Sequence, residues 1–307
     1  MGQNQRKNQI SPLESRLTNF VLVFPTLYFF VLVNVALHIG FKKINGNSHT
    51  NSIELLFIEV FLAVAFTLVP FVLCWGTEKP PLSYLGIKEG TRTGCSRFLE
   101  GLGISGVLLS LIFVFYLIMG WIKISSWWQP EQQPAYNVLL DAFLELLTLG
   151  VGAWVEEIVF RGYIFQALKE SLNNYCFAII ISSAFFGYIH TLGHEPFWGI
   201  LISTSVTGVF LALGRYFTQS LWLSIGLHFG WNVFQGIIFG FKVSGNDDFL
   251  KCHFICQDLT SSGGKQDIFT GGEYGPEGGI IAGIAAILGC IALYFLSKRL
   301  GWSTRQL

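Results

Sequence analysis

The sequence has few charged residues. Only 12% of its 307 residues are Asp, Glu, Lys or Arg, whereas soluble domains carry roughly 25%. Apolar residues make up 52%, and the mean hydropathy is +0.54. The 19 basic and 19 acidic side chains give zero formal net charge, without the clustered basic face that nucleic-acid binding requires. We therefore expect an integral membrane protein whose surroundings are the lipid bilayer, with no nucleic-acid partner.

The usual cysteine and metal motifs are also missing. The six cysteines are scattered without CxxC spacing, which excludes a zinc knuckle or a thioredoxin-type site. The HExxH spacing of zinc proteases is absent as well. Cys252 and Cys256 lie close together in a predicted outer loop, where a local disulfide is conceivable.

Long apolar runs define the expected architecture. Runs of about 17–25 residues predict membrane helices at 17–40, 53–75, 99–121, 138–160, 176–192, 197–213, 221–241 and 279–296. The first run is too long for a signal peptide and has no A-x-A cleavage site, so we expect it to remain. The fold class is thus predicted as all-α, a bundle of about eight transmembrane helices.

Basic residues orient this bundle. If the N-terminus is inside, the inner segments carry 13 of the 19 Lys and Arg residues and the outer loops carry 6. Basic residues are retained on the cytoplasmic side of membranes. An N-in, C-in topology is therefore predicted.

Four polar clusters interrupt the apolar runs. They are VEEIVFRGYIF at 155–165, FFGYIH at 185–190, LHFGWN at 227–232 and GGEYGPEGG at 271–279. A charge near the bilayer centre costs on the order of 3 kcal/mol, so such residues are candidates for function. For the fourth cluster the sequence indicates only a tight turn that could cover the site.

Helical spacing separates the roles of these residues. Glu157 and Arg161 are four residues apart and can pair on one helix face, which leaves Glu156 turned about 100° away. His228 and Asn232 are also four apart and can direct two hydrogen-bond donors at one point. Such donors can stabilise an oxyanion.

The combination suits peptide hydrolysis inside the membrane. A carboxylate in a low-dielectric pocket is a better base than one in water, so Glu156 could take a proton from a water that His190 orients. A zinc site of Glu156, His190 and His228 is the alternative, since two histidines and a glutamate form a known catalytic ligand set. Without an HExxH motif we favour chemistry that requires no metal.

Three motifs resemble one known family. EEIVFR fits EExxxR, FGYIH fits FxxxH and HFGWN fits HxxxN, in the order found in the CPBP (Abi) family. That family groups type II CAAX prenyl endopeptidases with bacteriocin-processing and immunity proteins. The resemblance implies that Glu156 and His190 activate water and that His228 and Asn232 form the oxyanion hole.

The resemblance also suggests supporting residues and a domain division. Glu157, Arg161 and Phe186 are implied as supporting side chains. We expect a cytoplasmic tail at 1–16, transmembrane helices and connectors at 17–136, the protease core at 137–300 and a second tail at 301–307. The expected location is a bacterial plasma membrane or a thylakoid-type membrane, and the expected substrate is a peptide or a membrane protein.

Two other classes of function stay open. Glu and His at mid-depth also serve proton or cation transport, although we find no internal repeat and no matching pair of broken spans. A membrane scaffold or immunity protein that cuts nothing is the third reading.

Overall fold

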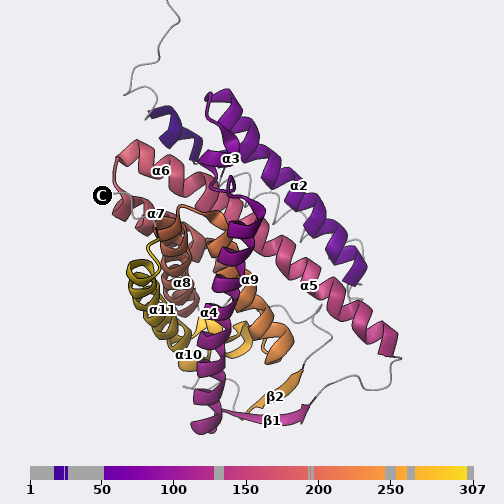
Figure 1. The fold of residues 1–307 in the computed structure, drawn as a ribbon. Coiled ribbons are helices and arrows are strands. Elements are labelled where there is room, and N and C mark those ends of the chain that lie inside the picture. The colour runs from indigo at the N-terminus through magenta and orange to yellow at the C-terminus, as the bar shows by residue number, and fades with distance from the viewer. Residues whose placement is uncertain are drawn as a thin grey trace, which may run out of the picture.

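The computed structural model describes residues 17–23, 25–26, 52–127, 135–192, 194, 197–245, 254–260 and 267–302. These residues form mainly helices (Figure 1). The long ones are α2 (Ser52–Gly76), α4 (Thr91–Ile118), α5 (Ala135–Glu157), α7 (Tyr175–His190), α8 (Phe197–Thr218), α9 (Leu221–Asn232) and α11 (Ile280–Arg299). Each corresponds to one predicted span. The remaining span, 17–40, is helical at 17–23 and 25–26 and otherwise lies outside the described residues.

Not all of these helices can cross a bilayer by length and hydropathy alone. Within the described residues three do so, namely Thr91–Ile118, Trp198–Thr218 and Ile280–Arg299. α9 is only 12 residues long, and α5 carries the acids Asp141, Glu145, Glu156 and Glu157. The predicted count of about eight transmembrane helices is therefore not confirmed, whereas the helical membrane architecture is.

α11 shows how the bundle meets lipid. Its side chains Ile284, Leu288, Ile291 and Phe295 are between 48% and 65% exposed, and their spacing places them along one helix face. The opposite face is buried and contains Ala282 and Ala286. A continuous exposed apolar face of this kind is expected where a helix contacts the hydrocarbon of a bilayer.

α4 and α9 lie against each other (Figure 1). They pack closely because glycines line their interface. A Cβ atom on Gly226 would lie 2.1 Å from the carbonyl oxygen of Phe98, and one on Gly101 would lie 2.5 Å from that of Leu223. Small residues allow such close approach of helices in membranes. α9, which carries two of the predicted site residues, is thereby fixed against α4 and also packs on α5 and α8.

α7 and α8 form a second close pair. A Cβ atom on Gly187 would lie 2.1 Å from Oγ of Ser205, so only glycine fits there. The Asn174 side chain caps α7 by accepting a hydrogen bond from the backbone N–H of Phe177 at 3.1 Å. This cap fixes where α7 begins and thus how far along the bundle its last residue, His190, lies.

The expectation of an all-α fold misses one element. Two predicted outer loops pair as an antiparallel ribbon of β1 (Ile122–Trp127) and β2 (Ile255–Leu259) (Figure 1). In β1 buried and more exposed residues alternate, which is the two-residue period of a strand. Long apolar runs, which predict membrane helices, do not reveal such a period. Cys256 lies in β2 as a buried free thiol, and Cys252 lies outside the described residues.

Candidate active site

The helix that carries both glutamates changes its winding directly after them. α5 ends at Glu157 and continues as a π-helix, η1 (Ile158–Ile164), and then as α6 (Phe165–Leu172). α9 does the same after Asn232, where the π-helix η2 (Val233–Ile238) begins. π-turns are rare and often occur at functional sites. Both lie directly beside predicted site residues here.

Glu157 and Arg161 form the buried ion pair that their spacing predicts. Nη1 of Arg161 lies 2.7 Å from Oε1 of Glu157, and the two side chains are 1% and 0% exposed. Arg161 also donates to the carbonyl oxygen of Gly208 at 3.2 Å, and its guanidinium carbon lies 4.1 Å from the ring centroid of Phe186. The pair therefore ties η1 to α7 and α8.

Phe186 and His190 are coupled one helical turn apart. Nδ1 of His190 lies 2.7 Å from the carbonyl oxygen of Phe186, and the two rings are 4.4 Å apart between centroids. Because a carbonyl can only accept, Nδ1 carries the proton and Nε2 of the neutral ring has a free lone pair. Nε2 lies 3.8 Å from Oε2 of Glu156.

His228 connects the ion pair to the site. Its Nδ1 lies 3.0 Å from Oε1 of Glu157, so this nitrogen donates to the carboxylate. Its Nε2 lies 3.9 Å from Oε2 of Glu156. With Nδ1 already protonated, Nε2 can donate a hydrogen bond only when the ring is an imidazolium, a charge that the Glu157 carboxylate stabilises.

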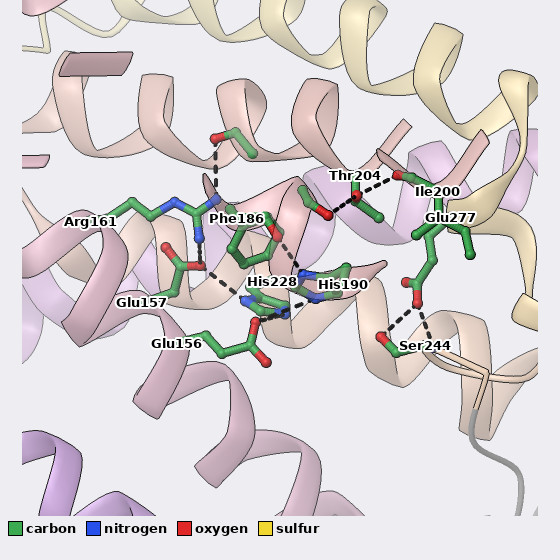
Figure 2. Close-up of polar contacts among 12 residues, drawn as sticks. Glu156, Glu157, Arg161, Phe186, His190, Ile200, Thr204, His228, Ser244 and Glu277 are labelled. Carbon is green, nitrogen blue, oxygen red and sulfur yellow. Dashed lines mark hydrogen bonds and ion pairs between the residues drawn. The ribbon is translucent and has the colours of Figure 1, made fainter. Parts of the chain in front are cut away.

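One cavity is lined by all four predicted catalytic residues. Figure 2 shows three of them, Glu156, His190 and His228, close to one another. It offers ≈ 50 Å³ to the centres of water-sized molecules, which is room for a few waters. Its lining consists of Glu156, Phe186, His190, Thr204, Thr207, Leu211, His228, Trp231, Asn232, Ser244 and Glu277. Glu157 and Arg161 lie behind this lining. The structure thus brings together the three predicted motifs, which are far apart in the sequence.

Glu277 and Ser244 are site residues that the sequence alone did not single out. Glu277 lies in the loop at 271–279, and its Oε1 accepts a hydrogen bond from Oγ of Ser244 at 2.8 Å. A sign was present in the sequence, because Glu277 is an acidic residue in a glycine-rich cluster that directly precedes an apolar span. Ser244 had no such sign.

The alternative zinc site can be compared with the geometry. Oε2 of Glu156 lies 3.8 Å and 3.9 Å from Nε2 of His190 and of His228. Ligands of one tetrahedral zinc would lie about 3.4 Å apart, given bonds near 2.0–2.2 Å. In the described part of the chain no group of three or more His, Cys, Asp or Glu is arranged to hold a metal ion. We therefore derive no step through zinc, and the metal-free mechanism remains a prediction.

A comparison with known protein families finds a match in the segment that contains the three motifs. The family described as "Type II CAAX prenyl endopeptidase Rce1-like" matches residues 138–234. No curated protein and no solved structure matches the chain. The matched segment contains all three motifs, from EEIVFR to HFGWN, and the family implies a CAAX protease-type hydrolase in a membrane. Residues 138–234, about a third of the chain, are therefore similar to the type II CAAX prenyl endopeptidases.

Proposed function

We propose that this protein is an intramembrane endopeptidase in which Glu156 and His190 activate a water molecule. The main support is the position of Oε2 of Glu156, which faces both imidazole Nε2 atoms at 3.8–3.9 Å. These distances are too long for direct hydrogen bonds. Within the described residues this buried oxygen has no hydrogen-bond partner, so a water between the carboxylate and His190 would satisfy it.

The reaction then balances through Glu156. The carboxylate takes a proton from water, and the water oxygen forms a bond to the peptide carbonyl carbon while His190 orients it through Nε2. The negative charge moves to the carbonyl oxygen. When the carbon–nitrogen bond breaks, Glu156 returns its proton to the leaving nitrogen. The products are a carboxylic acid and an amine.

His228 and Asn232 are proposed to hold the oxyanion. They lie one turn apart on α9 and both line the cavity. The imidazolium of His228 donates through Nε2, with its charge supported by Glu157, and the Asn232 amide donates beside it. Two donors fixed before the reaction stabilise the developing charge without reorganisation.

Substrate and setting follow as further parts of the proposal. The substrate is a peptide or a membrane protein, and the chain sits N-in, C-in in a bacterial plasma membrane or a thylakoid-type membrane. No cofactor is required, and no nucleic acid takes part. The lipid-exposed face of α11 and the apolar helices support the membrane setting.

The decisive experiment compares two glutamate variants of the purified protein in detergent on a fluorogenic peptide library. Glu156→Gln should lower kcat by about 10²- to 10⁴-fold, the usual contribution of a general base. Glu100→Gln is the matched control, because this carboxylate lies near the start of α4 and pairs with Arg97. Undiminished cleavage by Glu156→Gln would contradict the proposal. Ion flux in vesicles without any cleavage would favour transport instead. If the protein showed neither cleavage nor ion flux, a scaffold would be favoured.

A further inference from the structure

The loop at 271–279 holds Glu277 in the cavity by fixed backbone geometry. It consists of two 3₁₀ turns, η3 (Gly272–Tyr274) and η4 (Pro276–Gly278), joined by Gly275 with φ 102°. A Cβ atom on Gly275 would lie 2.2 Å from the carbonyl oxygen of Lys242. Only glycine fits this position, so the turn directs the following glutamate inward. Glu277 is 7% exposed.

Ser244 holds one of the two carboxylate oxygens. Both its backbone N–H and its hydroxyl donate to Oε1 of Glu277, while Oε2 takes no part in these bonds (Figure 2). Ser244 itself has a φ of 51°, an uncommon conformation for a residue other than glycine. Strained backbone of this kind often occurs at ligand sites. The carboxylate is thus anchored through one oxygen, and the other remains for a partner.

The charges around the cavity are unbalanced. Among the described residues two carboxylates line it, from Glu156 and Glu277, and none of the described Lys or Arg residues belongs to the lining. The positive charges that act on Glu277 are those that His190 and His228 can carry. Burial raises the pKa of Glu277, in the turn before α11, whereas the Ser244 donors and the two histidines act in the opposite direction. A buried carboxylate in such surroundings is stabilised by an incoming cation.

We propose that Glu277 is a specificity-determining residue that selects substrates with a basic side chain beside the cleaved bond. This inference rests on the proposed function and specifies its substrate. An endopeptidase cuts internal bonds, so the cation comes from Lys or Arg rather than from a chain terminus. Because the cavity has room for only a few waters, the end of such a side chain would lie close to both carboxylates. A substrate that presents a carboxylate there is disfavoured by the same charges.

The test compares peptide pairs that differ in one charge. Each pair carries either Lys or neutral Nε-acetyl-lysine at a position adjoining the bond that the wild-type protein cuts. Wild-type protein should show kcat/KM about 10- to 100-fold higher for Lys, as for a hydrogen bond between charged groups. Glu277→Gln should reduce this ratio to near 1. Since both peptides are measured on the same preparation, the ratio does not depend on the folded fraction.

Glu273→Gln is the matched control, because Glu273 lies in the same loop, is 73% exposed and pairs with Lys242 outside the cavity. This variant should keep the wild-type ratio. The inference is refuted if wild-type protein shows no preference for Lys, or if Glu277→Gln keeps the preference. It is also refuted if Glu277→Gln slows both peptides equally while the ratio stays high. Absence of any Glu156-dependent cleavage would instead refute the proposed function itself.

Discussion

The buried ion pair of Glu157 and Arg161 permits an experiment that separates folding from chemistry. Both side chains are at most 1% exposed, and Oε1 of Glu157 also accepts from Nδ1 of His228 at 3.0 Å. Arg161→Met leaves the carboxylate buried with the imidazole as its remaining partner. Removing one member of a buried pair costs about 3–5 kcal/mol. We expect this single variant to lose that much stability.

The double variant Glu157→Leu/Arg161→Met should behave differently. Apolar replacement of both members of a buried pair is often neutral or stabilising by about 1–4 kcal/mol. Met can occupy the place of the guanidinium against the ring of Phe186. We therefore expect near wild-type stability. His228, however, loses the carboxylate that supports its imidazolium, and kcat should fall about 10²- to 10³-fold, the cost of one oxyanion donor.

Two measurements on the detergent-purified variants check this reasoning. Tryptophan fluorescence during unfolding reports stability, and cleavage of a peptide that wild-type protein cuts reports kcat and KM separately. The prediction requires that the double variant has near wild-type stability and a low kcat, and that the single variant Arg161→Met is less stable. If the double variant is as unstable as Arg161→Met, the pair itself is needed for folding. If it keeps full activity, His228 does not depend on Glu157.

Two further predictions concern packing and metal. Gly226→Ala places a Cβ atom 2.1 Å from the Phe98 carbonyl oxygen and should cost about 1–3 kcal/mol, seen as a lower unfolding midpoint. Gly103→Ala on α4, where a Cβ meets nothing within 4 Å, should cost nothing, and equal effects of the two variants would contradict the packing argument. Active purified protein should carry no stoichiometric zinc by elemental analysis. One zinc per chain, lost with His190→Ala, would reverse this prediction.

The sequence predicts the helices and the local pairs because both depend on short separations. Apolar runs locate the long helices, and a spacing of four residues is enough to pair Glu157 with Arg161. The same spacing brings Nδ1 of His190 within hydrogen-bond distance of the carbonyl oxygen of Phe186, although the FxxxH motif does not specify this bond. The family resemblance implied that Glu156, His190, His228 and Asn232 serve one site.

Contacts between distant segments could not be predicted in the same way. The bond from His228 to Glu157 joins residues 71 positions apart, and no pattern in either helix indicates it. Ser244 reaches Glu277 across 33 positions and from an unusual backbone conformation. The β1–β2 ribbon joins two loops whose strands are too short to stand out among apolar helices. Each depends on how the bundle is assembled rather than on local preference.

The π-helix after Glu157 has a consequence for how one long helix serves two sets of neighbours. A turn that takes in one additional residue sets the following side chains back by about 100° relative to an uninterrupted α-helix. α5 presents its packing face to α2 and α9, whereas α6 presents a face to α7. The change in side-chain orientation at η1 allows α5 and α6 to pack against different neighbours although they belong to one continuous helical segment. The two carboxylates stand at the point where that orientation changes.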